Sequence, residues 1–164
     1  MMAFSHVVLG VMAASAAEGV TTGTALSPMA VVAAGAGSLM PDIDSPHSWL
    51  GRRLPFISWP LAGLIGHRGL THSLVIMAII AAVLVFYAPP VWGRAFLVAY
   101  LVHIGADMLT NSGVPLMWPS ERRYRVLGIQ TGGIVEWVGV TATIAACAVA
   151  IYSGAWPAVM RLPL

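Results

Sequence analysis

The sequence contains no lysine, and eight arginines are its only permanently basic side chains. Charged residues make up 9% of the chain and hydrophobic residues 59%, with a mean hydropathy of +0.86. Soluble domains carry about 25% charged residues, so this composition predicts a membrane protein, with residues 1–164 forming a single transmembrane domain. The pI near 9.1 does not indicate nucleic-acid binding, because the net charge is only +2 and no dense basic stripe is present.

Cysteine is nearly absent. Cys147 is the only one, which excludes an intrachain disulfide, and we interpret it as a small packing residue. The sequence also lacks a Gly-x-Ser-x-Gly elbow, a phosphate-binding glycine loop and a dinucleotide fingerprint. No basic residue precedes Arg52, so we expect the N-terminal helix to be retained rather than cleaved as a signal peptide.

The apolar runs predict an all-α polytopic membrane protein, a bundle of four to five transmembrane helices with short or re-entrant segments. The expected long helices are 4–17, 27–40, 71–87, 92–110 and 133–152. The first two are shorter than the ~20 residues of a full span, and their alanines and glycines suit close helix packing. Four prolines interrupt 41–69. Within that stretch, 56–65 is apolar but too short to span and is interpreted as an interfacial or re-entrant piece.

The arginines predict the orientation of the bundle. Six of the eight lie in the two loops that flank the predicted third and fourth helices, and these are Arg52, Arg53, Arg68, Arg122, Arg123 and Arg125. Two spans separate the loops, so the loops share one side, and the positive-inside rule marks that side as cytoplasmic. We therefore predict a multi-pass protein of the inner (plasma) membrane.

Ionisable side chains inside apolar segments are costly, and they mark candidate sites. Counting through the predicted helices places most of them at the cytoplasmic end of the bundle: His6, Asp42, Asp44, His72, Asp107 and Glu136. Glu18 is the exception and is expected at the opposite end. Such sorting is not expected of scattered structural polar residues, so it predicts one site toward the cytoplasmic side.

Two pairs of polar residues have the spacing of metal ligands. His103 and Asp107 are four residues apart, so in a helix they share one face; the alternative is a hydrogen-bonded pair that joins two helices. Asp42 and Asp44 repel each other unless a cation lies near them. The alternative for them is a solvated turn, and they share a face only if their segment is extended.

A polar motif at 67–73 precedes the third predicted helix, for which Thr71 is the expected N-cap. A loop that enters a helix can bring both His67 and His72 to one ion. Arg68 between them is a candidate contact for a phosphate or carboxylate, with positive-inside anchoring as the alternative. Glu136 opens the last helix, where the helix dipole favours an acid, and we consider it as a general base or as a supporting residue.

The candidate metal ligands are all histidines and aspartates: His6, Asp42, Asp44, His67, His72, His103 and Asp107. Such donors, without cysteine, suit a divalent metal, Zn first, with Mn or Fe as alternatives. Seven candidates exceed what one tetrahedral ion needs, so one or two ions are considered, the second sharing a bridging aspartate.

The order of these motifs resembles the YdjM family, described as inner-membrane, metal-dependent hydrolases. The resemblance runs from His6 through 41–44, 67–73 and His103-x-x-x-Asp107 to Gly113 and Pro119. It implies that His6, Asp42 or Asp44, His67, His72, His103 and Asp107 bind metal. It does not fix a substrate.

These observations together predict a membrane-embedded, metal-dependent hydrolase in which a metal activates water. The expected partners are membrane lipids, with a lipid or phosphate-ester substrate at the cytoplasmic face and Arg68 and Glu136 in the catalytic site. The alternatives are a membrane metal-binding protein or metal transporter without hydrolytic activity, and a structural polar cluster without metal. A transporter should carry polar groups on toward the opposite face.

Overall fold

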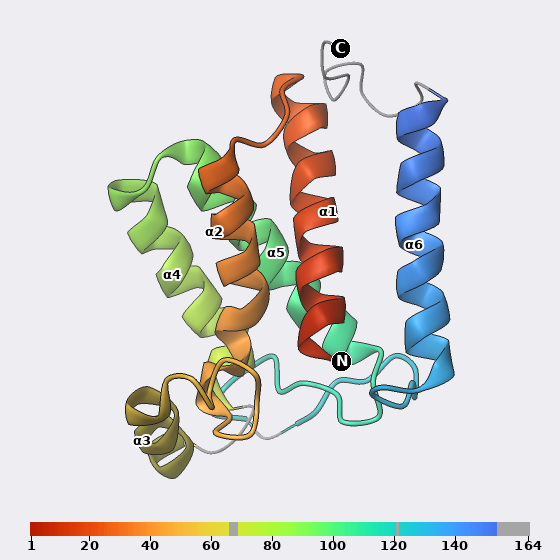
Figure 1. Ribbon diagram of the computed structural model, residues 1–164. Helices are drawn as coiled ribbons and strands as arrows, with labels where there is room; N and C mark the ends of the chain where they lie inside the picture. The colour runs from red at the N-terminus through yellow and green to blue at the C-terminus, as the bar shows by residue number, and fades with distance from the viewer. Residues whose placement is uncertain (66–68, 121, 154–164) are drawn as a thin grey trace.

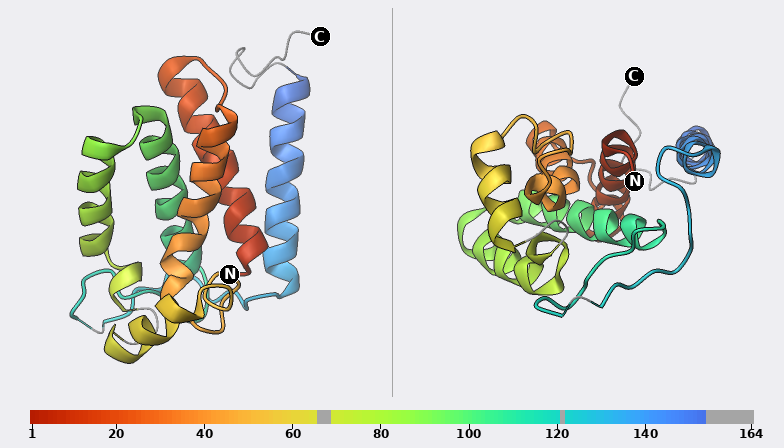
Figure 2. Two further views of the ribbon diagram at one scale, coloured as in Figure 1. Left: turned by 60° about the vertical axis from the view of Figure 1, so that its left-hand side comes forward. Right: turned by 90° about the horizontal axis from the view of Figure 1, so that it is seen from below.

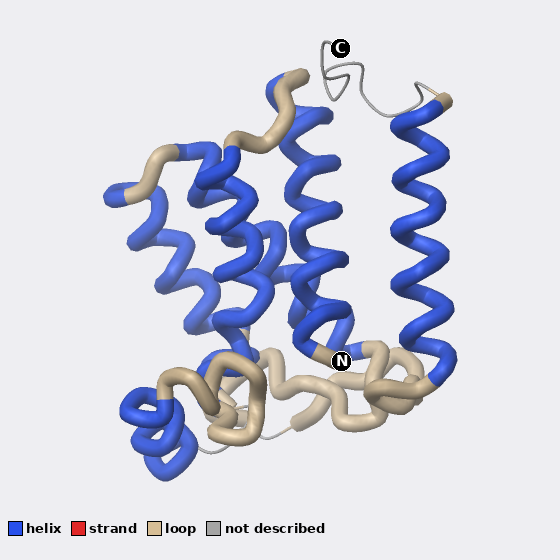
Figure 3. Tube along the Cα trace, viewed as in Figure 1, coloured by secondary structure: helices blue, strands red, loops and turns tan. Residues whose placement is uncertain are grey.

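The computed structural model describes residues 1–65, 69–120 and 122–153, and over these residues its regular elements are all helices (Figure 3). The α-helices are α1 (Ala3–Thr22), α2 (Pro28–Leu39), α3 (Pro55–Ile65), α4 (Leu74–Tyr87), α5 (Pro90–Met108) and α6 (Ile134–Tyr152). Two short 3-10 helices, η1 (Met40–Asp44) and η2 (Leu70–His72), precede α3 and α4 respectively. The all-α class is confirmed.

Five of the α-helices run side by side, and the sixth, α3, lies across one end of them (Figures 1 and 2). The α1–α2 and α4–α5 connections lie at one end of the bundle. The other end, called here the site end, carries the N-terminus, η1, η2 and the loop 109–133. Two helices, α1 and α6, are long and apolar enough to cross a membrane by length and composition, whereas α4 is a shorter apolar helix. That these helices cross the membrane, and that the protein is multi-pass, stays a prediction.

Small residues let α1, α2 and α5 approach closely, as was predicted from composition for the first two of these helices. The buried apolar cluster among them consists of Ala14, Ala30, Ala34, Ala95 and Ala99. A Cβ atom on Gly37 would lie 2.2 Å from the backbone oxygen of Phe96, and one on Gly10 would lie 2.2 Å from Ser38 Oγ. The backbones of α2 and α5 therefore meet where no larger residue fits, next to Ser38.

The structure corrects two predicted helix ends. α1 continues beyond residue 17 to Thr22 and ends at Gly23, which adopts the left-handed conformation and donates its amide to the Gly19 carbonyl. α4 begins at Leu74, and its cap is Ser73, whose Oγ accepts the Ile76 amide at 3.3 Å. Thr71 is not the N-cap, because its side chain bonds to Asp44 instead.

Two helices pack loosely on the rest of the described chain. In α6 the only buried residues are Glu136 and Val140, and α6 lies beside α1 at the edge of the bundle (Figure 2). The 11-residue α3 has the length expected of a piece too short to span. Its large apolar side chains Phe56, Trp59 and Leu64 are 90%, 68% and 84% exposed, which soluble surfaces rarely tolerate and a membrane interface accommodates.

Candidate metal centre

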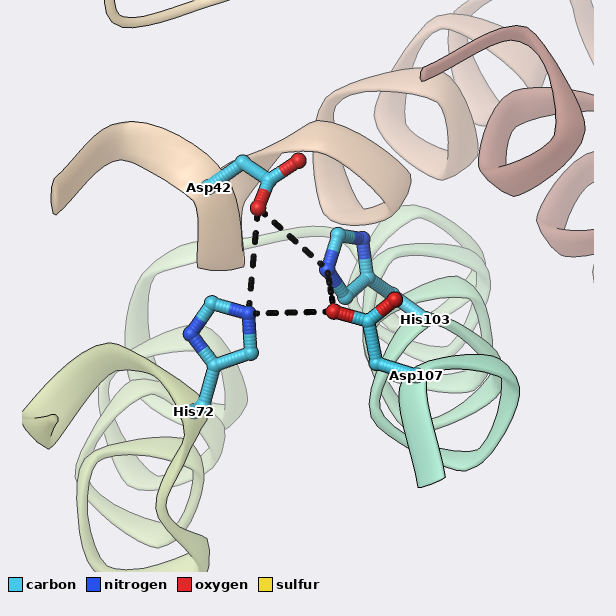
Figure 4. Close-up of side chains that lie close together, drawn as sticks. All are labelled: Asp42, His72, His103 and Asp107. Atoms are coloured by element: carbon cyan, nitrogen blue, oxygen red, sulfur yellow. Dashed lines mark ion pairs between the residues drawn. The ribbon is translucent and has the colours of Figure 1, made fainter. Parts of the chain in front are cut away.

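Four side chains from three separate segments converge at the site end (Figure 4). They are Asp42 of η1, His72 of η2, and His103 and Asp107 of α5; we call them the four-residue cluster. His72 Nε2 lies 3.8 Å from Asp42 Oδ1 and 3.7 Å from Asp107 Oδ2. His103 Nε2 lies 3.8 Å and 3.9 Å from the same two oxygens. One ligand atom from each residue lies within 4.8 Å of the others.

The local backbone explains which aspartate joins the cluster. Residues 42–44 adopt a 3-10 helix rather than an extended form. A 3-10 helix has three residues per turn, so side chains that are two positions apart point in different directions. Asp42 consequently faces the cluster, whereas Asp44 Oδ2 lies 4.0 Å from the other ring nitrogen of His72, Nδ1. On α5, His103 and Asp107 are one turn apart and share a face.

The hydrogen bonds fix which nitrogen of each ring faces the cluster. His103 Nδ1 lies 2.6 Å from the Ser38 carbonyl oxygen, which can only accept, so Nδ1 carries the proton. His72 Nδ1 lies 3.3 Å from Thr71 Oγ1, and because the Thr71 hydroxyl donates its proton to Asp44 Oδ2, Nδ1 is the donor to the hydroxyl oxygen. In the neutral rings, therefore, both Nε2 atoms offer a lone pair toward the cluster, and in the described part of the chain neither has a hydrogen-bond partner.

This arrangement places two nitrogen lone pairs and two carboxylate oxygens around one point. His72, His103 and Asp107 are fully buried, and the side chain of Asp42 is 15% exposed. The separations of 3.7–3.9 Å are too long for hydrogen bonds between these atoms. Four acceptors facing each other, three of them fully buried, are unfavourable without a cation among them.

The donor set and the spacing fit a divalent metal ion. The four ligand atoms all lie within 4.8 Å of one another. With a small contraction of the site, a single ion among them could be bound by all four at about 2.0–2.2 Å, the length of Zn–N and Zn–O bonds. Imidazole and carboxylate donors also suit Mn and Fe. The four-residue cluster could thus bind one metal ion.

His6 lies against the cluster without belonging to it. Its buried ring stacks on His103, with the ring centroids 3.6 Å apart and the planes at 14°. Its Nε2 lies 3.3 Å from Asp107 Oδ1, the oxygen that faces away from the four-residue cluster. The Met1 amino group contacts the same oxygen at 2.5 Å. The structure therefore brings His6 to the site as a neighbour of two cluster residues.

Glu136 lies at the start of α6, outside the cluster, and its oxygens bind other partners. Oε1 accepts from Ser5 Oγ at 2.5 Å and from the Met2 amide at 2.8 Å, and Oε2 accepts from the Gly132 amide at 2.9 Å. These bonds join α6 to the start of α1, which carries His6. Of the two roles considered from the sequence, they favour the supporting one.

The remaining candidates lie elsewhere. His67 and Arg68 fall outside the residues that the structure describes. Glu18 lies at the opposite end of the bundle, as expected, where Arg94 Nη2 donates to its two oxygens at 3.0 and 3.1 Å. The roles of Thr71 and of the Ser38 carbonyl were not predicted from the sequence. Thr71 stood in the polar motif and could have been considered, whereas no sequence signal identifies a particular carbonyl.

Comparisons with known proteins agree with the resemblance noted from the motifs. A family model described as YdjM inner membrane protein matches residues 1–161. Inner membrane protein YdjM of Escherichia coli (strain K12) is 46% identical over 108 residues, 60% of this chain and 54% of that protein; the protein of the same name from Shigella flexneri gives the same values. Uncharacterized protein YvsG of Bacillus subtilis (strain 168) is 33% identical over 124 residues, 73% of this chain and 78% of that protein. This chain thus spans about half the length of the first two relatives. No solved structure matches it.

Proposed function

The chain is a membrane protein that belongs to the YdjM family, and from this premise we propose that it is a metal-dependent hydrolase whose site is the four-residue cluster. The observation that carries the proposal is the convergence of four buried or nearly buried acceptors from η1, η2 and α5. Two of these acceptors are imidazole nitrogens that have no hydrogen-bond partner in the described chain. A structural polar cluster would pair its donors with its acceptors instead.

In this proposal Asp42, His72, His103 and Asp107 hold one divalent ion, zinc in the first instance. When bound, such an ion lowers the pKa of a coordinated water and polarises the bond under attack. The Ser38 carbonyl and Thr71 keep the two imidazoles in the tautomer that a ligand needs. Asp42 is the one ligand with solvent exposure, so substrate would approach from its side.

We further propose a substrate with a lipid or phosphate-ester group, taken from the cytoplasmic leaflet. A cleft of about 450 Å³ between α1, α5 and α6 supports a lipid, because apolar residues line it, among them Leu9, Met12 and Ala13 of α1, Ala106 of α5 and Leu109, which follows α5. Ala106 is the chain neighbour of Asp107 and Leu9 follows His6 by three residues, so we propose that an acyl chain in this cleft would bring a headgroup toward the cluster. Arg68, which belongs to the same sequence motif as His72, is proposed to contact the anionic group of the substrate.

A metal transporter is the second candidate, and the far end of the bundle does not favour it. Between the cluster and that end, the core of α1, α2 and α5 consists of buried alanines. At the far end the carboxylate of Glu18 is already paired with Arg94. A path for ions needs polar groups along its length, and none lines this part of the described core.

The test is the metal content of detergent-purified protein, measured by mass spectrometry for wild type, His72→Ala and Asp107→Ala. His47→Ala is the matched control, because His47 is exposed and outside the cluster. We expect about one ion per chain in wild type and control, and loss in both cluster variants, because each variant removes one of the four ligand atoms. A stoichiometric metal would then justify a screen of lipid and phosphate esters. Wild-type protein that stays metal-free after reconstitution would refute the proposed function.

A further inference from the structure

Two polar side chains, Thr71 and Asp44, lie beside His72 Nδ1, on the side of the ring away from the four-residue cluster. Thr71 Oγ1 lies 2.5 Å from Asp44 Oδ2 and 3.3 Å from His72 Nδ1. Asp44 and His72 are fully buried, and Thr71 is 9% exposed. The three residues come from η1 and η2, so this contact also joins the two segments that supply Asp42 and His72 to the cluster.

The direction of these bonds follows from what each group can donate. An ionised carboxylate only accepts, so the single hydroxyl proton of Thr71 goes to Asp44. The hydroxyl oxygen then offers its lone pairs to His72 Nδ1, which must carry a proton. His72 Nε2 is left as an acceptor, and it is the nitrogen that faces Asp42 and Asp107.

We propose that Asp44 and Thr71 are positioning residues for His72. Asp44 orients the Thr71 hydroxyl, and this hydroxyl selects the metal-binding tautomer of the His72 ring. Asp44 thus supports a ligand rather than serving as one. The inference rests on the proposed function in that the bound group is a metal ion. Partners of this kind fix ring orientation and raise ligand basicity at metal sites.

The backbone of η2 is held so that the Thr71 side chain stays in place. The hydroxyl of Tyr100, which is almost fully buried on α5, donates to the Thr71 carbonyl oxygen. Ser73 Oγ donates to the Leu70 carbonyl at 2.7 Å, and the Ser73 amide donates to the same oxygen at 3.0 Å. The η2 turn that carries Thr71 is therefore held at its start, through the Leu70 carbonyl, and from α5, through Tyr100.

The experiment uses Thr71→Val, which keeps the shape of the side chain and removes the hydroxyl, beside Thr71→Ser, which restores it. Asp44→Asn and Asp42→Asn separate a supporting carboxylate from a ligand. The matched control is Thr22→Val, which removes another threonine–carboxylate bond, from Thr22 Oγ1 to Glu18 Oε1 at 3.0 Å, at the far end of the bundle. Two readouts are taken in full-length protein: the ¹⁵N chemical shifts of the His72 ring without metal, and the dissociation constants of Zn²⁺ and Co²⁺ with the Co²⁺ absorption spectrum.

We expect His72 of the metal-free wild type to be protonated at Nδ1, and Thr71→Val to lose this preference. Thr71→Val and Asp44→Asn should weaken metal binding about 10- to 100-fold and change the Co²⁺ spectrum, while Thr71→Ser and Thr22→Val stay near wild type. Asp42→Asn should abolish binding.

Two results would overturn the inference. One is a Thr71→Val protein with the wild-type tautomer and affinity; the other is an Asp44→Asn protein that loses metal as completely as Asp42→Asn, which would make Asp44 a ligand. If the His72 tautomer depends on Thr71 but the protein binds no metal, the positioning role of Asp44 and Thr71 is supported and the proposed function is refuted. The two failures are therefore distinguishable.

Discussion

At the scale of single residues, Asp107 connects the most partners. Its Oδ2 faces His72 and His103 within the four-residue cluster, and its Oδ1 contacts His6 and the Met1 amino group. His6 contacts the cluster through this second oxygen and through stacking on His103. The geometry therefore separates a residue that supplies a ligand atom from one that supports two ligands.

This separation predicts unequal effects of two histidine substitutions. His103→Ala removes a ligand atom and should lower metal affinity by more than about 100-fold, whereas His6→Ala should cost about tenfold, in the range of supporting partners. Competition with a chromophoric chelator measures both dissociation constants. Equal losses would mean that His6 is itself a ligand, as the sequence alone suggested.

At the scale of elements, the contact between α2 and α5 sets the position of His103. The Ser38 carbonyl binds His103 Nδ1, and Gly37, its neighbour, lies against the α5 backbone at Phe96. Gly35, on the same helix, has open space where a Cβ would lie. The close approach, rather than helix propensity, therefore explains glycine at 37.

Gly37→Ala should destabilise the protein by about 1–3 kcal/mol, because the added methyl group overpacks the helix contact. It should also weaken metal binding, since Ser38 moves with α2. Gly35→Ala is the control and should be neutral or stabilising by about 0.5–1 kcal/mol, since alanine favours a helix. Unfolding in sodium dodecyl sulfate, followed by circular dichroism, measures both. A Gly37→Ala protein as stable as the control would contradict the packing explanation.

The exposed apolar side chains of α3 predict that this helix lies in the membrane interface. In a Cys147→Ala background, a nitroxide label at Leu64→Cys should be found near the boundary of headgroups and acyl chains, about 5–10 Å deep. A label at Ile144→Cys, midway along α6, should lie deeper and serves as the reference. Accessibility to oxygen and to a water-soluble nickel complex gives the depths; a label on α3 that is fully accessible to the nickel complex would refute this placement.

At the scale of the whole molecule, polarity is sorted between the two ends. The four-residue cluster, Glu136 and five of the described arginines lie at the site end, while Glu18 and Arg94 pair at the other (Figure 1). The five are Arg52, Arg53, Arg122, Arg123 and Arg125. By the positive-inside rule the site end should face the cytoplasm.

Sidedness can be tested with single cysteines in the same Cys147→Ala background. Thr131→Cys lies in the loop at the site end, and Ala25→Cys lies in the α1–α2 connection; both positions are exposed. A membrane-impermeant maleimide added to intact spheroplasts should label Ala25→Cys and should label Thr131→Cys only after permeabilisation. The reverse pattern would place the cluster on the outer side of the membrane.

The sequence alone determined the features that depend on composition and local periodicity. Low charge and apolar runs specified an all-α membrane protein. The four-residue spacing predicted that His103 and Asp107 share one face of a helix. The order of the predicted helices placed most of the unusual ionisable residues at one end of the bundle. The family resemblance, which the comparisons confirm, followed from the order of the motifs.

Only the tertiary structure decided which of these residues meet. The 3-10 turn at 42–44 selects Asp42 for the cluster and turns Asp44 toward Thr71. The packing of α2 on α5 brings the Ser38 carbonyl to His103, and residues at the start of α1 donate hydrogen bonds to Glu136. Such contacts join residues far apart in the chain, so their partners depend on how helices pack, and local sequence patterns carry no record of that packing.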